Sequence, residues 1–353
     1  MLLSVNAGCA GYRPVPEFDP GEQPEASALP GTPLTRLWLA RPLRGPTAPV
    51  ARDSVNLYMG GADRRVIAVD LASGKTRWAH RVAGPLLGGV LEADGVVFAA
   101  TDRPDGKLHA FQSVSGNELW ATGTGYVEAP PALLEDRLIV LNRRGEALAL
   151  DRTRGKVLWR RRLPSQRLPP LPLPGGLLLV TSHDSLYLVR PSDGVVTLRR
   201  PAPGAITAPW AWVGGDLVAG TGDSLVVAIG TDSLDLRWSA RLDAPVLASP
   251  VVRGDTVFAV TFRGTIYRIP PVRPRRAESL WAGAWPVTGA PAIFGDWLLV
   301  GGSEGMLRAI TLTDGVEAWT TPLGRPLELA PVVLGGEGFV ALGGRGDLHR
   351  ITR

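Results

Sequence analysis

A tryptophan that recurs about every 40 residues constrains the fold of this chain more than any other feature. Seven of the 11 tryptophans keep this spacing, and a leucine stands where one copy lacks it. The eight positions are Trp38, Trp78, Trp120, Trp159, Leu198, Trp238, Trp281 and Trp319. A fixed period of this length indicates a protein built from copies of one small structural unit.

Each copy is predicted to contain four short strands. A proline-containing apolar segment comes first, as at 290–292, and a second apolar strand follows, as at 296–300. A glycine-bearing turn then leads to a third strand with alternating apolar residues, and a second tight turn leads to the strand that carries the tryptophan. Four strands in about 40 residues form the blade of a β-propeller.

The composition supports an all-β fold with many turns. The chain has 43 glycines and 32 prolines in 353 residues, and both residue types destabilise helix interiors. Disorder is the other interpretation of such a composition, but 45% hydrophobic residues provide enough apolar surface for a core. We therefore expect a folded chain of short strands joined by tight turns.

Counting the repeats predicts an eight-bladed β-propeller of four-stranded blades. The last copy has only three strands, at 329–333, 338–342 and 347–352. Residues 35–39 have the pattern of a fourth strand, yet no strands precede them. We expect this N-terminal strand to complete the last blade, because that pairing removes an open edge from the ring. The propeller would then span 34–353, after a tether at 1–33.

The single cysteine, Cys9, is a candidate for lipidation. Small residues precede it, as in the lipobox of bacterial lipoproteins, although Asn6 departs from that motif and only eight residues come before Cys9. A lipoprotein would therefore have a longer start upstream of Met1. The alternative is a free thiol of no importance. A proline- and glutamate-rich stretch at 12–33 suits a flexible tether, and one cysteine excludes an intramolecular disulfide.

The charge pattern does not indicate a nucleic-acid partner. The net charge is +5, the arginines are scattered, and 33 acidic residues lie among them. The run Arg160, Arg161 and Arg162, with Arg273, Arg275 and Arg276 elsewhere, could meet anionic groups but is better explained as a solvated edge. No apolar run is long enough for a membrane-spanning helix.

The motif D-x-x-[ST]-G-x-x-x-W, which ends at Trp78, resembles the pyrroloquinoline-quinone-like propeller repeat. Looser copies end at Trp159 and Trp319, so the resemblance covers 34–353. In this family, the tryptophan of the outer strand docks between neighbouring blades. The eight repeats, the closing strand and the lipobox together are similar to family members that are lipoproteins of outer-membrane β-barrel assembly.

This resemblance implies a non-catalytic interaction scaffold at the periplasmic face of an outer membrane. The lipid on Cys9 would anchor it there, and it would act as a monomeric propeller within a complex. Its partner would be a β-barrel assembly protein or an unfolded barrel substrate. In the related lipoproteins, charged and aliphatic loop residues at one end of the propeller contact the partner. The corresponding loops here are 198–207 and 241–247, with Arg199, Arg200 and Asp243 as candidate contact residues.

Quinone-dependent dehydrogenases share this repeat, so an enzyme or a quinone-binding sensor is the alternative. The resemblance implies a vicinal disulfide and a calcium site in such enzymes, but one cysteine cannot form that disulfide. We predict no catalytic residue, cofactor or metal. The G-x-S-x-G match at 301–305 and the Arg-Gly-Asp at 345–347 are predicted to be turns between strands. The histidines, which lack paired spacing, are His80, His109, His183 and His349.

Overall fold

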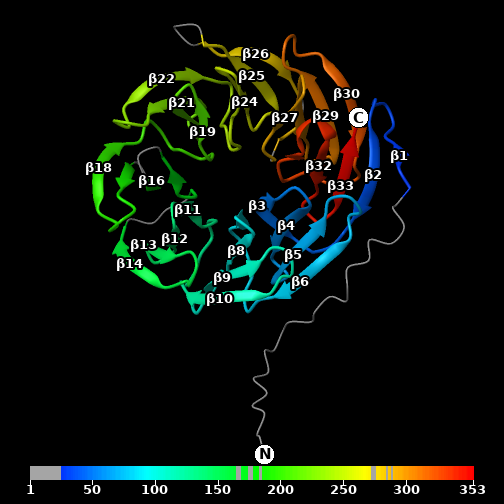
Figure 1. Ribbon diagram of the computed structural model, residues 1–353. Helices are drawn as coiled ribbons and strands as arrows, with labels where there is room; N and C mark the ends of the chain where they lie inside the picture. The colour runs from blue at the N-terminus through cyan, green and yellow to red at the C-terminus, as the bar shows by residue number, and fades with distance from the viewer. Residues whose placement is uncertain are drawn as a thin grey trace, which may run out of the picture.

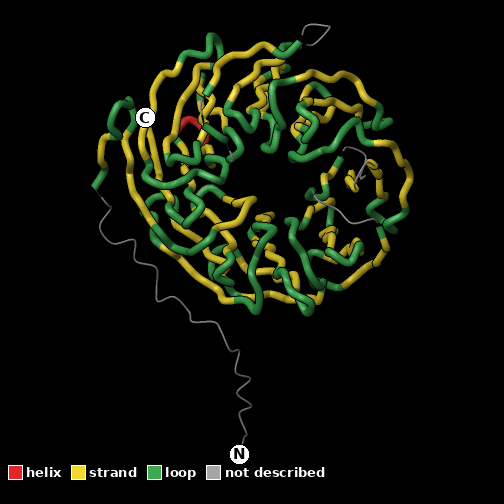
Figure 2. Tube along the Cα trace, turned by 180° about the vertical axis from the view of Figure 1, so that it is seen from behind, coloured by secondary structure: helices red, strands yellow, loops and turns green. Residues whose placement is uncertain are grey.

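The structure is a ring of β-sheets around a central opening (Figures 1 and 2). It is a computed structural model that describes residues 25–163, 168–173, 178–182, 185–271, 276–283, 285–287 and 289–353. Within these residues the strands form eight sheets, seven with four strands and one with five. The only helical element among them is the short 3-10 helix η1 (Gly335–Glu337). The prediction of an all-β fold is therefore confirmed.

In the four-stranded sheets, strands that follow one another in the sequence are neighbours. The first strand of each sheet lies nearest the central opening and the fourth lies at the rim of the ring (Figure 1). The first four of these sheets contain β3 (Pro46–Arg52), β4 (Asn56–Gly61), β5 (Arg65–Asp70) and β6 (Thr76–Arg81); β7 (Val90–Ala93), β8 (Val96–Ala100), β9 (Lys107–Gln112) and β10 (Glu118–Gly123); β11 (Ala132–Leu134), β12 (Arg137–Asn142), β13 (Glu146–Asp151) and β14 (Val157–Arg162); and β15 (Leu171–Pro172), β16 (Leu178–Ser182), β17 (Ser185–Val189) and β18 (Val196–Pro201).

Three more four-stranded sheets follow the same order, and the five-stranded sheet joins strands from both ends of the described chain. They contain β19 (Ala211–Val213), β20 (Asp216–Gly220), β21 (Leu225–Gly230) and β22 (Leu236–Arg241); β23 (Val251–Arg253), β24 (Thr256–Val260), β25 (Thr265–Ile269) and β26 (Glu278–Ala282); β27 (Ala292–Phe294), β28 (Trp297–Gly301), β29 (Met306–Thr311) and β30 (Glu317–Pro322); and, in the five-stranded sheet, β1 (Ser27–Ala28), β2 (Thr35–Ala40), β33 (Leu348–Thr352), β32 (Phe339–Leu342) and β31 (Val332–Val333).

The middle strands of each sheet form the core. In β12 and β13 nearly every residue is buried, since each sheet packs between two neighbours and both faces are covered. One core cluster, for example, joins Phe98 and Leu108 of one sheet to Leu138 and Leu148 of the next. The hydrophobic core therefore lies between the sheets and continues around the ring.

The repeated tryptophan holds neighbouring sheets together through a glycine. Trp78 Nε1 donates a hydrogen bond to the carbonyl oxygen of Ser113 in the next sheet, at 2.7 Å. A Cβ atom on Gly116 would lie 2.6 Å from the indole, and this glycine has a φ of +73°. Only glycine meets both conditions without strain. The same contact is made by the pairs Trp38 and Gly74, Trp120 and Gly155, and Trp159 and Gly194.

Leu198 and Leu234 replace this pair in one place. Leu198 occupies the tryptophan position on β18, and Leu234 occupies the glycine position in the next sheet. The Leu234 amide donates to the Gly230 carbonyl, just as the Gly116 amide donates to Gln112, and Leu234 keeps a positive φ of 57°. Both leucines pack in one cluster. Because Leu234 fills the space above its turn, a leucine at 198 fits where an indole would collide.

Two later tryptophans make other contacts. A Cβ on Gly315 would meet the carbonyl oxygen of Leu280 rather than the indole of Trp281, whose ring centre instead lies 5.4 Å from that of Trp285. Trp319 is buried and packs edge-on against Trp297, with ring centres 5.6 Å apart. The same place in the repeat therefore does not imply the same contact.

The first and last parts of the described chain share one sheet. β2 pairs antiparallel with β33, and the register shifts between Arg36 and Trp38, as it does near the other outer-strand tryptophans. β1 adds a fifth strand outside β2, and Leu29 and Leu34 are buried beneath this hairpin. The sheet thus begins before residue 34, where the sequence had placed the boundary of the propeller.

Candidate functional site

The antiparallel order of the strands gives the ring two distinct ends. One end carries the links between successive sheets and the turns between second and third strands, such as 242–250 and 261–264; we call it the linker end. The other end carries the turns between third and fourth strands, such as 113–117; we call it the glycine-turn end. Two neighbouring loops at the linker end form the candidate interaction site.

Arg199 and Arg200 do not lie in a loop. Both are on the outer strand β18, where the sequence had placed the start of a partner-binding loop. The Arg199 guanidinium lies 5.5 Å from the ring centre of Tyr187, and Arg200 Nε is 3.2 Å from Asp235 Oδ1 in the next sheet. Thr122 and Arg161 also stand two positions after a repeated tryptophan. Each donates a side-chain hydrogen bond to a backbone carbonyl in the turn of the next sheet. Arg200 therefore has a structural role between sheets.

Asp243 lies at the linker end, in the connection between β22 and β23. It is exposed, and its Oδ2 accepts a hydrogen bond from Thr265 Oγ1 at 2.8 Å. The Phe262 amide donates to the Pro245 carbonyl at 2.8 Å, so the β22–β23 connection and the β24–β25 turn hold each other. Of the three candidate contact residues, the structure places Asp243 alone in a loop.

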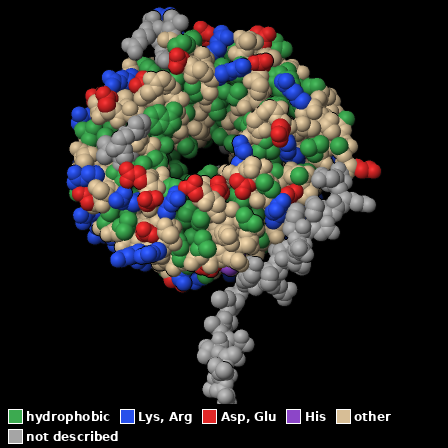
Figure 3. Space-filling model, viewed as in Figure 1, with side chains coloured by type: hydrophobic (Ala, Val, Ile, Leu, Met, Phe, Trp, Pro, Cys, Tyr) green, Lys and Arg blue, Asp and Glu red, His purple; other side chains and the backbone are tan. Residues whose placement is uncertain are grey.

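Two exposed hydrophobic side chains accompany Asp243 on these loops. Leu247 is 46% exposed and Phe262 is 43% exposed, and they stand on two connections that hydrogen-bond to each other. We call Asp243, Leu247 and Phe262 the linker-end patch. Figure 3 shows hydrophobic side chains among charged ones around the central opening. Exposed apolar groups beside a charge are typical of a protein-binding surface.

Leu247 and Phe262 do not stand out in the sequence. Alternating patterns report which strand residues are buried, but they carry no information about side chains in connections. One signal was present: the turn at 261–264 places a phenylalanine where a polar residue is usual.

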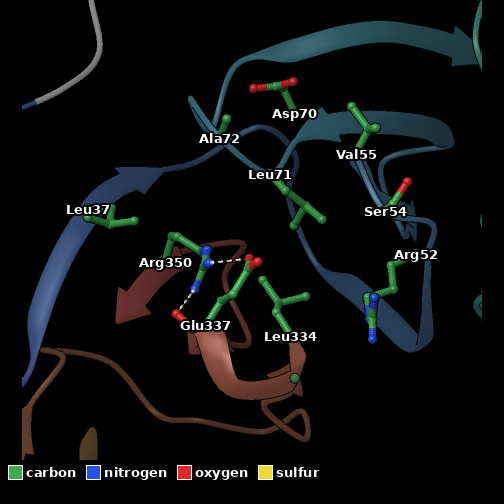
Figure 4. Close-up of a pocket in the computed structure, with 11 residues that line it drawn as sticks. Leu37, Arg52, Ser54, Val55, Asp70, Leu71, Ala72, Leu334, Glu337 and Arg350 are labelled. Atoms are coloured by element: carbon green, nitrogen blue, oxygen red, sulfur yellow. Dashed lines mark hydrogen bonds and ion pairs between the residues drawn. The ribbon is translucent and has the colours of Figure 1, made fainter. Parts of the chain in front are cut away.

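A hollow of about 620 Å³ opens at the glycine-turn end, between the sheet of β3 to β6 and the five-stranded sheet (Figure 4). Arg350 lines it and is buried, with Glu337 Oε2 4.0 Å from its Nη2. Burial lowers the pKa of Arg350, and Glu337 partly opposes this effect. Asp70 lines the other wall; burial would raise its pKa, but hydrogen bonds from Ser73 and Arg77 bring it below the usual value. These charged groups are already satisfied within the protein.

His80 and His109, which lie far apart in the sequence, both contact Glu118. His109 Nδ1 lies 3.2 Å from one carboxylate oxygen and His80 Nε2 lies 3.6 Å from the other. Burial lowers the pKa of His80, while the hydrogen bond from His109 is the main cause that lowers the pKa of Glu118. The described segments contain no group of His, Cys, Asp and Glu arranged to hold a metal ion. The three residues act as a contact between adjacent sheets.

The other sequence motifs are structural or lie outside the described residues. The G-x-S-x-G match is the turn between β28 and β29, and Arg-Gly-Asp is the turn between β32 and β33, with Asp347 buried. Arg160 is 3.8 Å from Glu146, so the basic run on β14 is partly neutralised. The positions outside the described residues are Cys9, His183, Arg273 and Arg275. Within the described segments, no helix has the length and apolar character needed to cross a bilayer.

Comparison with known families identifies the repeat. A family model described as outer membrane protein assembly factor BamB matches residues 30–167, 104–212 and 191–271. The chain belongs to this family. The structure of BamB from Moraxella catarrhalis superposes with a TM-score of 0.76 at 16% identity, covering 91% of this chain and all of that one. The chain is therefore a propeller of the pyrroloquinoline-quinone-like class with the fold of BamB.

Other solved structures share this fold, and some of them are alcohol dehydrogenases. The designed protein Ika8 covers 94% of this chain with a TM-score of 0.74 at 16% identity. A quinohemoprotein alcohol dehydrogenase from Pseudomonas putida covers 90% of this chain and 76% of its own length, with a TM-score of 0.65 at 13% identity. The curated quinoprotein alcohol dehydrogenase PedH, also from Pseudomonas putida, is 42% identical over 66 residues. That match spans 18% of this chain and 11% of the dehydrogenase, so it concerns a short segment.

Proposed function

We propose that this BamB-family propeller is a non-catalytic scaffold that assists the assembly of outer-membrane β-barrel proteins from the periplasmic side. Its eight sheets would be the blades of a closed ring, with β2 as the outer strand that ties the last blade to the first. Residues upstream of the ring would tether it to the membrane through a lipid on Cys9. The ring would act as a monomer within the assembly complex.

The linker-end patch carries this proposal. Leu247 and Phe262 stand on two loops that hold each other through the Pro245 carbonyl, so their positions are set before a partner arrives. A pre-ordered surface loses little conformational freedom on binding, and its exposed apolar side chains can act as the centre of an interface. Asp243 lies at the margin of this surface, where a charge contributes more to orientation than to affinity.

Co-purification from detergent-solubilised membranes tests the proposal. The tagged wild-type chain is expected to recover a barrel-assembly protein, identified by mass spectrometry. The double variant Leu247→Ser/Phe262→Ser should recover at least about tenfold less of it, because loss of about 1.4 kcal/mol of binding free energy already lowers affinity tenfold and a central interface side chain can contribute more than this. Val114→Ser is the control, since Val114 is 72% exposed at the glycine-turn end. Equal recovery by the double variant, or no barrel-assembly protein with the wild type, would contradict the proposal.

A quinone-binding propeller is the second candidate, favoured by the 66-residue match to quinoprotein dehydrogenases. The residues that the structure describes do not offer a carboxylate cluster that would hold calcium beside a quinone. A titration with pyrroloquinoline quinone and Ca²⁺, followed by absorbance, separates the two candidates. Saturable binding of the quinone would favour the second.

A further inference from the structure

A hollow lined by arginines lies at the linker end of the seam between the first and last parts of the chain. It has a volume of about 570 Å³ and is lined by Arg41, Arg44, Arg325, Arg345 and Asp347, with two glycines. Three segments far apart in the sequence build it: the β2–β3 link, the β30–β31 link and the β32–β33 turn. The pairing of β2 with β33 brings the first and last of these segments together.

One carboxylate already occupies the floor of this hollow. The Asp347 side chain is 3% exposed, accepts a hydrogen bond from Arg41 Nε, and lies 3.2 Å from Arg325 Nε. The turn that carries Asp347 is firmly seated, because a Cβ on Gly346 would lie 1.9 Å from the Leu43 carbonyl oxygen. The hollow therefore presents guanidinium groups from a rigid base.

The positive charge of the hollow exceeds its negative charge. Four guanidinium groups face one buried carboxylate. Two acids lie beside the hollow: Glu328 packs against one of its glycines, and Asp63 accepts a hydrogen bond from the Arg44 amide but is ion-paired with Arg65. Glu328 is therefore the neighbouring acid that most weakens the attraction of the hollow for an anion.

Two of the four guanidinium groups are unpaired. Within the described residues, the side chains of Arg44 and Arg345 have no hydrogen bond or ion pair, and both residues are exposed. Other exposed arginines stand in turns at this end, at 64, 143, 144 and 263, whereas this hollow gathers four. The unpaired groups are free to bind an anion.

We propose that this hollow binds an acidic peptide segment of a partner protein. Arginine pairs with carboxylates through two parallel hydrogen bonds, and Asp347 shows that the hollow already accommodates one carboxylate. The volume exceeds that of a single carboxylate, so a segment with neighbouring acidic side chains fills it better than one ion. The hollow also opens at the same end as Leu247 and Phe262. The proposal goes beyond the proposed function and rests on it only for the partner being a protein.

Binding of a labelled peptide to the whole chain tests this proposal. The probe is a fluorescent peptide with four consecutive glutamates, and its matched control has four glutamines. The wild-type chain is expected to bind the glutamate peptide, with affinity falling as salt screens the charges between about 0.05 and 0.3 M. Arg44→Gln/Arg345→Gln should weaken binding about tenfold, because two charge-assisted contacts are lost. Neither side chain has a partner within the described structure, so folding should be spared.

Two further variants separate a site from general charge. Glu328→Gln should strengthen binding about two- to threefold, since it removes an acid beside the hollow. Arg154→Gln, an exposed arginine at the glycine-turn end, should change affinity less than twofold. Equal binding of both peptides, or equal loss with Arg154→Gln and with Arg44→Gln/Arg345→Gln, would overturn the proposal. Displacement of the peptide by inorganic phosphate or phosphatidylglycerol vesicles at the same charge concentration would overturn the peptide assignment in favour of a phosphate-bearing ligand.

Discussion

The double variant Leu198→Trp/Leu234→Gly is expected to be about 3 kcal/mol more stable than the sum of its two single changes would make it, because each change alone is destabilising and the two together restore one contact. Leu198→Trp alone places an indole against the Leu234 side chain, and overpacking of this kind costs about 1–3 kcal/mol. Leu234→Gly alone removes a side chain that is 2% exposed, which costs about 2–5 kcal/mol. Relief of the positive φ at Leu234 offsets about 1 kcal/mol of that loss.

Together the two changes rebuild the contact seen between Trp78 and Gly116. The indole would then lie over a glycine and donate to a carbonyl of the next sheet, as Trp78 does to Ser113. The free energies of unfolding, measured by urea denaturation of all four proteins, should show a favourable coupling of about 3 kcal/mol. Additive effects of the two changes would contradict our explanation of why a leucine stands at position 198.

Lowering the pH from 7 to 4.5 is expected to destabilise the chain through His349. Burial, with the nearby charges of Arg36 and Arg41, lowers the pKa of His349 to about 4, and Asp347 only partly opposes this. An unfolded histidine has a pKa of about 6.5. Between these values the unfolded chain binds a proton that the folded chain does not, so stability falls as the pH falls. The full loss below pH 4 is about 3 kcal/mol.

The variant His349→Leu should remove this dependence. The free energy of unfolding of the wild-type chain and of the variant is measured from pH 7 to pH 4.5. The variant should lose less stability over this range, because leucine takes up no proton in either state. Val114→Ser is the control, since this exposed side chain takes up no proton and lies in a turn of another sheet. Parallel pH profiles for the wild type and His349→Leu would contradict the assignment.

The regular part of this fold could be predicted from sequence because each copy repeats one local solution. Gly74 and Trp38 of the preceding sheet form one contact, which requires both a glycine and a tryptophan. That contact recurs at a regular spacing along the sequence. The contacts of Trp281 could not be predicted, since its neighbour Trp285 lies outside the repeated pattern. Spacing identifies a position in a blade, whereas the local neighbours decide what the side chain touches.

The candidate sites were harder to predict because they depend on loops. Arg200 lay in the expected segment, yet its position two residues after the repeat residue directs it to Asp235 of the next sheet. The exposure of two apolar side chains, at 247 and 262, follows from how two connections pack together. The arginine hollow needs residues about 300 positions apart to meet, and only the pairing of β2 with β33 brings Arg41 and Asp347 together.

Photo-crosslinking from position 262 tests the central proposal most directly. Phe262 is replaced by p-benzoylphenylalanine in cells, and the same replacement at Val114 serves as the control at the other end of the ring. If the chain is a scaffold that binds through its linker end, irradiation should yield a crosslink to a barrel-assembly protein from position 262 and none from position 114. Crosslinks of equal yield from both positions, or none from position 262, would contradict the proposal.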